Sequence, residues 1–295
     1  MSPQSSSAAL VAGLIDVFAD TALSGNPLAV VEGADNLSDA QMRRIAGEFN
    51  QAETTFVMQS DRGDLKLRSF TAAGVEVGGA GHNALGAWLW LAEDGKLGPI
   101  EAPRTFQQEI GGEVLPIELR RVDGRIVGRM KQSTLKLGPA LTDLAPLTAA
   151  LGLSCEDVLS EPAARVADTG VAHLLVRLAD ISAVDRAEPS PRGLLKVLAA
   201  ASAEGCYVYA LDGAAPNRAY ARFFNPSVGL WEDAATGTAA GPLAAYLASE
   251  SMISGAIEIE QGTKMGRRSI LRVSLASEPE VSGAGIIVMR GRLSI

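Results

Sequence analysis

The stretch Gly79-Ala-Gly-His-Asn83 and its second copy, Ala235-Thr-Gly-Thr-Ala239, decide the fold of this 295-residue chain. Each copy leads directly into small and apolar residues, Ala84–Leu91 after the first and Ala240–Leu247 after the second. A glycine turn that opens an apolar helix leaves free backbone N–H groups at the positive end of the helix dipole, which favours an anion. Two such turns predict a cleft between two similar halves.

The duplication extends beyond the two turns. An aromatic-ended strand is predicted before each of them, at Leu65–Phe70 and at Ala219–Phe224. The pairs Phe70 and Phe224, Gly81 and Gly237, and Gly25 and Gly170 are each about 145 to 156 residues apart, roughly half the chain. A shared offset of this size predicts a tandem duplication of a domain-sized unit.

Length, composition and charge limit the class of protein. A chain of 295 residues is about two domains by the usual size of a domain, and 47% hydrophobic residues can fill two cores. The net charge of −8 and the pI near 5.0 disfavour nucleic acid as a partner, because a face that binds nucleic acid is basic. We therefore expect any anionic ligand to be held locally, by turns and helix ends.

No segment indicates a membrane span or an export signal. Met1–Gly13 is rich in serine and alanine but has no positively charged region of the signal-peptide type, so it predicts a loose tail. The longest apolar helical run, Ala84–Ala92, is far shorter than the ~20 residues that cross a bilayer. These features predict a cytoplasmic protein without a membrane partner.

Local patterns in the first half predict strands that flank one helix. Leu28–Val31 has the composition of a strand. Ser38 and Gln41 match a capping box, and the helix that they open is expected to end near Asn50. The next strand is predicted at Thr54–Met58, so Glu53 lies where the helix gives way to the sheet.

These elements favour an α+β fold. Strands outnumber helices and are joined by short turns, whereas a doubly wound parallel sheet needs regular alternation of strand and helix. Trp88–Leu91 make the first glycine-opened helix apolar on all sides, as a helix enclosed by a sheet must be. We predict two pseudo-symmetric domains, each a curved, mostly antiparallel sheet around one central helix.

The few cysteines and histidines give little support to a metal site. Cys155 and Cys206 lie in no metal-binding spacing, and His82 and His173 are the two histidines of the chain. A metal-free mechanism is the simpler prediction.

Six stretches, in order along nearly the whole chain, resemble the PhzF (phenazine-biosynthesis) isomerase family. They are Asp16–Phe18, Ser24–Val31, Ala52–Val57, Gly81–His82, Trp231–Thr238 and Gln261–Arg267. The resemblance implies the fold of diaminopimelate epimerase, in which two β-barrel-like domains each surround a helix and the active site lies between them. It also implies a homodimer and no cofactor. The expected domains are residues 1–125 and 126–279, with residues 280–295 returning to the first.

The same resemblance implies roles for particular residues. Glu53, in the Glu-Thr-Thr-Phe match, would be the acid/base that takes a proton from one carbon and returns it to another carbon on the same face of the substrate. His82 and Asp233 match the supporting catalytic residues of the family. The substrate-binding residues that it implies are Asn26, Gly81, Gly237 and Thr238, and Thr238 stands where the family commonly has serine.

The chemistry of these residue types suits such a reaction. Glutamate in water is a weak base toward carbon, but burial raises its pKa toward the optimum for acid/base work. Negative charge that develops on the substrate needs fixed donors, and one such donor is typically worth about 3–4 kcal/mol. The backbone N–H groups around Gly81–His82 and Gly237–Thr238 are expected to bind the substrate carboxylate.

Two other chemistries fit less well. Related epimerases carry a catalytic cysteine directly before the glycine of each turn, but Ala80 and Thr236 occupy those positions here, which disfavours a two-thiol racemase. Gly79-x-Gly81-x-x-Ala84 matches a loose dinucleotide fingerprint, and a nicotinamide oxidoreductase is therefore an alternative. The acidic residue that this motif needs would fall near Glu101, outside a clear second strand.

Several positions depart from the family pattern. Asn83 and Ala234 stand where the family commonly has proline, and Ala72–Gly74 carries one extra residue. These departures keep open a binding protein that retained the fold without the chemistry. The sequence nevertheless predicts a cofactor-independent isomerase of a small carboxylate, cyclic or unsaturated, with either a dihydroaromatic acid or an amino-acid derivative as the substrate.

Overall fold

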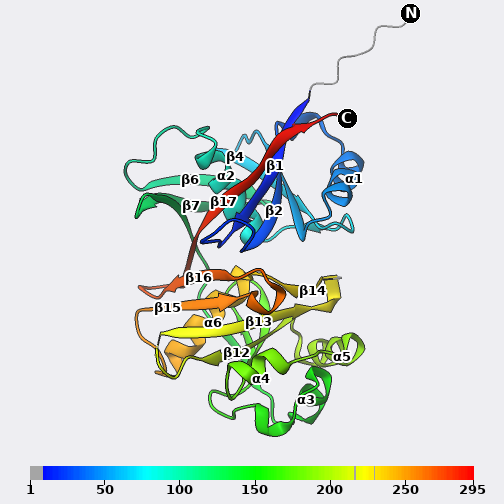
Figure 1. The fold of residues 1–295 in the computed structure, drawn as a ribbon, viewed down its shortest axis with the longest axis vertical. Helices are drawn as coiled ribbons and strands as arrows, with labels where there is room; N and C mark the ends of the chain where they lie inside the picture. Colours follow the sequence, from blue (N-terminus) through cyan, green and yellow to red (C-terminus); the bar gives the residue numbers. More distant parts are fainter. Residues whose placement is uncertain (1–8, 216, 229) are drawn as a thin grey trace, which may run out of the picture.

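A computed structural model describes residues 9–215, 217–228 and 230–295 and contains two similar halves, one above the other in Figure 1. The first half carries α2 (His82–Glu93) and the second carries α6 (Gly237–Ser249), each beginning at one of the two glycine turns. Strands far outnumber helices in both halves, as the sequence predicts. The α+β class with two pseudo-symmetric sheet-and-helix units is thus confirmed.

The strands of the first half close into an eight-stranded barrel. Successive neighbours pair antiparallel except for β2 with β3 and β4 with β6, and β17 closes the ring between β8 and β1. The barrel strands are β1 (Leu10–Val17), β2 (Asn26–Glu32), β3 (Glu53–Met58), β4 (Leu65–Phe70), β6 (Arg104–Ile110), β7 (Glu113–Val122), β8 (Arg125–Lys131) and β17 (Glu280–Leu293).

The second half repeats the same order of pairings. β10 to β11 is antiparallel, β11 to β12 parallel, β12 to β13 antiparallel, β13 to β15 parallel and β15 to β16 antiparallel. Its strands are β9 (Lys136–Ala140), β10 (Arg165–Asp168), β11 (Ala172–Arg177), β12 (Gly205–Leu211), β13 (Arg218–Asn225), β15 (Ala256–Gln261) and β16 (Ser269–Ser274). The short strands β5 (Glu76–Val77) and β14 (Leu230–Asp233) pair with β4 and β13 just before α2 and α6. This shared pattern confirms the internal duplication.

Each central helix is enclosed because its sequence offers no polar face. In α2 every residue from His82 to Ala92 is buried, and Trp88 and Trp90 are fully inaccessible. Both indole N–H groups find acceptors in the surrounding sheet: Trp88 donates to Gln108 Oε1 at 3.0 Å and Trp90 to Glu32 Oε1 at 2.8 Å. The apolar side chains of α2 and α6 join one continuous core.

The remaining helices lie outside the two sheets that surround α2 and α6 (Figure 1). Ser38 caps α1 in the predicted box with Gln41, and Asn50 ends the helix in a left-handed conformation. These helices are α1 (Asp39–Phe49), α3 (Ala145–Leu151), α4 (Ile181–Arg186) and α5 (Pro191–Ala201), with short 3-10 turns η1 (Ala34–Asn36), η2 (Cys155–Asp157), η3 (Pro226–Val228) and η4 (Thr263–Met265).

Two chain segments cross between the halves. β17 pairs through Glu280–Ser282 with β16 and β8, and its later residues pair with β1. The other crossing joins β8 to β9, and there the Gln132 N–H donates to Pro279 O at 2.9 Å. Because β8 pairs with β7 and β17, we propose that the first domain extends to about residue 131 rather than to residue 125.

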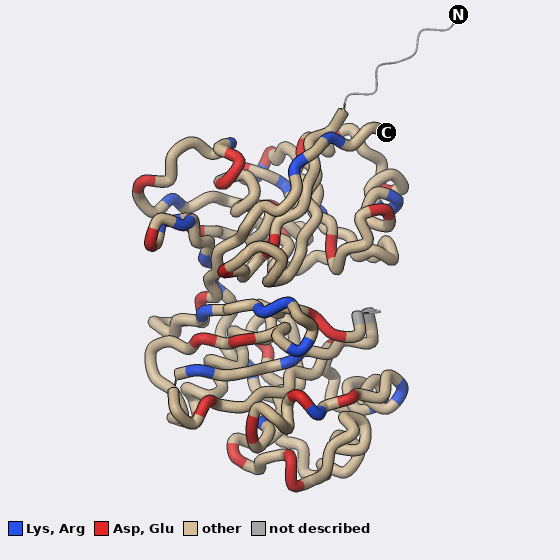
Figure 2. Tube along the Cα trace, viewed as in Figure 1, with Lys and Arg blue, Asp and Glu red and all other residues tan. Residues whose placement is uncertain are grey.

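Basic and acidic residues are interspersed along both halves (Figure 2). Within the residues that the structure describes, no helix has both the length and the apolar character that a bilayer-spanning helix requires.

The close approach of α2 to the sheet gives a test of this packing. A Cβ at Gly86 would lie 2.6 Å from Leu28 Cδ2 and 2.6 Å from Val17 Cγ2, two fully buried side chains. Gly86→Ala should therefore lower the free energy of unfolding by about 1–3 kcal/mol, although alanine favours the helix itself by about 1 kcal/mol. Urea unfolding followed by circular dichroism measures the change.

Gly47→Ala is the matched control. Gly47 lies on the exposed side of α1, where a Cβ would make only an ordinary contact, 3.5 Å from Ala72 O. This substitution should raise the free energy of unfolding by up to about 1 kcal/mol. A gain of stability in both variants would show that α2 has more room than the packing described above.

Candidate active site

The two glycine turns meet where the halves face each other. A Cβ at Gly81, the residue before α2, would lie 3.9 Å from Thr238 Cγ2 in the first turn of α6. The opening N–H groups of a helix have no acceptor within that helix and carry its positive dipole end. Two such helix ends therefore lie together, one contributed by each half.

Polar side chains occupy part of each turn. The Gly81 N–H donates to Asn83 Oδ1 at 2.7 Å, and the Asn83 amide donates to Gly79 O and Ser69 Oγ. In the second turn the Thr236 N–H donates to Gln261 Oε1 at 3.2 Å. The Gly81 amide is thus used within its own turn, and the N–H groups that follow it along α2 are the ones left for a ligand.

Glu53 is the first residue of β3, at the end of an element as the sequence predicts. Glu53 as a whole is only partly buried, but its Oε2 atom is inaccessible to solvent and has no hydrogen-bond partner among the described residues. Burial, and secondarily the negative charge of Asp233, raises the pKa of Glu53 to about 8. Glu53 therefore holds a proton at neutral pH.

Asp233, the last residue of β14, is a carboxylate with a different environment. Its Oδ1 accepts from Asn26 Nδ2 at 2.7 Å and its Oδ2 from Thr236 Oγ1 at 2.6 Å. Burial raises the pKa of Asp233 to about 6, and these hydrogen bonds, with others from the Ala234 and Ala235 N–H groups, oppose that rise. At neutral pH the pair consists of an ionised Asp233 and a protonated Glu53.

Asn26 links the two halves across 207 positions of sequence. It is 1% exposed, and besides Asp233 its amide reaches Ala235 O at 3.0 Å. Arg267 fixes the neighbouring turn, because its guanidinium donates to Asp16 Oδ1 at 2.6 Å and to Gly25 O at 3.0 Å. The turn that carries Asn26 is thus held on the second half by side chains of both halves.

His82 is the first residue of α2 and is buried. Burial lowers its pKa to about 4, so its imidazole is neutral at physiological pH. Its Nε2 is inaccessible and has no partner among the described residues. A neutral ring in this place can donate or accept one hydrogen bond without adding charge.

The structure thus gathers the residues expected from the sequence into two neighbouring groups. Asn26 donates a hydrogen bond to Asp233, and the charge of Asp233 raises the pKa of Glu53. In the other group Gly81 lies next to Thr238. Their roles in binding and catalysis stay predictions. The sequence did not indicate Gln261, Thr236 or His173 as site residues. In the structure Thr236 and Gln261 donate hydrogen bonds to Asp233, and His173 Nε2 lies 3.1 Å from Thr238 Oγ1. Gln261 stands in one of the six family-like stretches, and His173 follows Gly170, the counterpart of Gly25.

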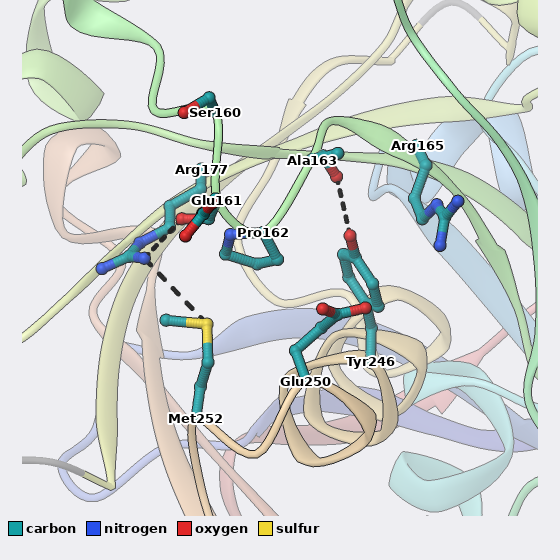
Figure 3. Close-up of a pocket in the computed structure, with 9 residues that line it drawn as sticks. All are labelled: Ser160, Glu161, Pro162, Ala163, Arg165, Arg177, Tyr246, Glu250 and Met252. Atoms are coloured by element: carbon teal, nitrogen blue, oxygen red, sulfur yellow. Dashed lines mark hydrogen bonds between the residues drawn. The ribbon is translucent and has the colours of Figure 1, made fainter.

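One cavity of the structure lies away from this site. It has a volume of about 510 Å³ and lies at the end of α6, with Tyr246 and Glu250 on one side and Arg165 and Arg177 around it (Figure 3). No residue predicted for the site lines this cavity. Among the described residues there is also no group of three or more His, Cys, Asp or Glu side chains placed to hold a metal ion.

Comparison with known proteins agrees with this architecture. A sequence model of the phenazine biosynthesis-like (PhzC-PhzF) family matches residues 15–291. The chain is 35% identical over 289 residues to a trans-2,3-dihydro-3-hydroxyanthranilate isomerase of Pseudomonas chlororaphis, covering 95% of this chain and 98% of that protein.

Solved structures share the fold. A PhzF-family protein of Bacillus anthracis superposes with a TM-score of 0.86 at 24% identity, covering 98% of this chain and 100% of that one. A hydroxyproline epimerase of Agrobacterium vitis superposes with a TM-score of 0.64 at 11% identity, covering 97% and 91%. Both likenesses concern the fold alone, and they confirm the epimerase-like architecture.

The raised pKa of Glu53 predicts a pH dependence of stability. The folded state keeps a proton on Glu53 up to a pKa of about 8, whereas the unfolded chain releases it near 4.5. Between these values the folded state binds more protons, so Glu53 lowers stability as pH rises, by up to about 1.4 kcal/mol per pH unit. Glu53→Gln should therefore gain stability relative to the wild type as pH rises from 5 to 8.

Urea titrations at several pH values measure this difference. Glu48→Gln on the exposed face of α1 is the control, and its stability should follow the wild-type pH profile. Parallel profiles for Glu53→Gln and the wild type would contradict a buried, protonated Glu53.

Proposed function

The chain belongs to the PhzC-PhzF family of phenazine biosynthesis-like proteins and is an isomerase, and we propose that it moves a proton between two carbons of a small carboxylate through Glu53, without a cofactor. The observation that carries this proposal is the Glu53 carboxyl itself. Its Oε2 is buried and unpartnered within the described residues, and its pKa is raised by burial and by the charge of Asp233.

The proton transfer needs one group that works in both directions. A carboxyl with a pKa near 8 gives up and takes back a proton readily at neutral pH, which suits a residue that is base and then acid. Because the pKa of Glu53 is about 8, the proposed step starts from the minor fraction of Glu53 that is ionised at neutral pH. This carboxylate removes a proton from one carbon, and the C–H electron pair moves into the conjugated system and shifts the double bond. The resulting Glu53 carboxylic acid then protonates a second carbon, so the enzyme neither gains nor loses a proton.

Backbone N–H groups are available to stabilise the negative charge that develops on the substrate. The first N–H groups of α2 and α6 have no acceptor within their helices, and these two helix starts lie beside each other. We assign the substrate carboxylate to these donors, with Thr238 and the neutral His82 beside it. Asp233 keeps its negative charge through four donors and holds Asn26 and Thr236 in place.

The relatives support a proposal for the substrate class. The Pseudomonas chlororaphis protein is named for a dihydroaromatic amino acid, and we propose a dihydroaromatic carboxylate of this type for the present chain. Asn83 alters the lining of the site because its side-chain oxygen accepts the hydrogen bond of the Gly81 N–H. We therefore expect a substrate that differs in detail from that of the relatives. We also propose that the protein is a cytoplasmic homodimer. Light scattering during gel filtration measures the mass of the particle and thus tests the dimer.

Exchange of carbon-bound hydrogen tests the reaction. In heavy water the wild type should incorporate deuterium into trans-2,3-dihydro-3-hydroxyanthranilate or shift its double bond, as seen by NMR. Glu53→Gln should lose about 10²- to 10⁴-fold in rate, the usual contribution of general acid/base catalysis. Amino-acid carboxylates in the same panel test the alternative substrate class.

Glu48→Gln, an exposed change of the same kind, should retain the wild-type rate. Equal exchange by the wild type and Glu53→Gln would remove Glu53 from the mechanism. Exchange by neither protein with any dihydroaromatic acid would count against the proposed substrate class.

The two cysteines provide a second test, since a two-base racemase of this fold would need thiols. Cys155 is exposed in η2, and Cys206 is fully buried in β12, where burial raises the pKa of its thiol to about 12. The double variant Cys155→Ser/Cys206→Ala should therefore turn over the same substrate at the wild-type rate. Loss of activity in a variant that melts like the wild type would point to thiol chemistry instead.

A further inference from the structure

His173 has no part in the mechanism above, yet it touches a proposed substrate-binding residue. It lies in β11, is 2% exposed, and its Nε2 is 3.1 Å from Thr238 Oγ1. Its other ring nitrogen, Nδ1, is inaccessible and has no partner among the described residues. The Thr238 hydroxyl makes no second hydrogen bond to another side chain within those residues.

The orientation of the His173 ring is fixed by packing. Phe223 of β13 meets it edge to face, with ring centroids 4.9 Å apart and planes at 86°. Phe223 can take this position because Gly205, which pairs with His173 across β11 and β12, has no side chain; a Cβ there would lie 2.3 Å from Phe223 Cζ. The imidazole therefore cannot turn away from Thr238 without disturbing the core.

Burial decides the charge of the ring, and hydrogen bonding decides where its one proton lies. Burial lowers the pKa of His173 to about 4, with Asp168 opposing the shift, so the ring is neutral at physiological pH. A proton on Nδ1 would be a buried donor without an acceptor, which is rarer in proteins than a buried acceptor without a donor. A proton on Nε2 can be donated to Thr238 Oγ1.

We propose that His173 is a positioning residue that donates from Nε2–H to Thr238 Oγ1 and thereby leaves the Thr238 hydroxyl proton free to be donated to a carboxylate oxygen of the substrate. This inference rests on the proposed function, which places that carboxylate at the α6 turn. With the opposite tautomer the Thr238 hydroxyl would donate its proton to Nε2. The Thr238 oxygen would then present only lone pairs to an anion. His173 thus sets which way the hydroxyl points its proton.

The β-branched side chain of Thr238 fits this role. Threonine has restricted rotation about χ1, and here its methyl group lies toward Gly81 while its oxygen lies toward His173. A hydroxyl that is held at its oxygen and free at its proton is ordered before the ligand arrives. Such preorganisation reduces the entropy lost on binding.

The tautomer can be read in the free protein, independently of any substrate. Nitrogen-15 NMR of the imidazole rings distinguishes the two neutral tautomers, and because the chain has two histidines, a His82→Asn sample assigns the signals. We expect His173 to carry its proton on Nε2 near pH 7. A proton on Nδ1 would overturn the proposal whatever the protein binds.

Binding of an inert ligand tests the consequence. The probe is 3-hydroxyanthranilate, the aromatic counterpart of the dihydro acid, which cannot undergo the isomerisation. Calorimetry should show about 3- to 10-fold weaker binding for His173→Phe, which keeps a ring against Phe223 but cannot donate, and a similar loss for Thr238→Val. Because His173 acts through Thr238, the double variant should bind no more weakly than Thr238→Val alone.

His173→Gln offers an amide donor to Thr238 Oγ1 and should bind closer to the wild type than His173→Phe does. Losses that multiply in the double variant, or failure of glutamine to rescue, would show that His173 affects binding by another route. If the wild type does not bind 3-hydroxyanthranilate, the proposed substrate class fails, and the NMR tautomer alone then decides the inference about His173. Thermal melts confirm that each variant is folded.

Discussion

A helix that is apolar on every side must be enclosed, and this constraint organises the whole molecule. α2 has no polar face, so a barrel of strands closes around it and its indole N–H groups must find acceptors within the sheet. The enclosed helix can expose only its ends. Because the chain contains two such units, the N-terminus of α2 and that of α6 can meet, and the N–H groups that a helix cannot satisfy internally gather there. The place where an anion can bind is thus a consequence of how the two cores are filled.

At the same junction the carboxyl groups of Glu53 and Asp233 have different pKa values. Asp233 is surrounded by donors from the Asn26 side chain, from Thr236 and from its own turn, and these hold its pKa well below that of Glu53. Glu53 receives no comparable donor among the described residues. Asp233 therefore stays ionised while Glu53 keeps a proton, although the Asp233 side chain and the Glu53 Oε2 atom are both shielded from solvent. The difference lies in the hydrogen bonds and not in the residue type.

The segment between β8 and β9, which crosses from one half to the other, contacts the first turn of α6. Gln132, in the segment between β8 and β9, donates its amide to Gly237 O at 2.8 Å and accepts from Thr169 Oγ1 at 2.7 Å. The side chain fits because Gly241 has no Cβ, which would otherwise lie within 1.7 Å of Gln132 Oε1. The first turn of α6 is thus tied to the segment that joins the halves, so the spacing between the halves and the position of that turn are set together.

The sequence by itself determined the two helix-opening turns, the enclosed α2 and the capping of α1, because each depends on residues close together in the chain. It also determined the duplication, because the same short patterns occur twice at a shared offset. It also indicated Glu53, His82 and Asp233 as candidate residues, through their places in short ordered motifs. Only the tertiary structure decided what surrounds them. The bond from Asn26 to Asp233 spans 207 positions, the contact of His173 with Thr238 spans 65, and β17 returns to pair with β1 from the far end of the chain. The pKa of Glu53 and the tautomer of His173 depend on burial and on partners of this kind, which no local pattern records.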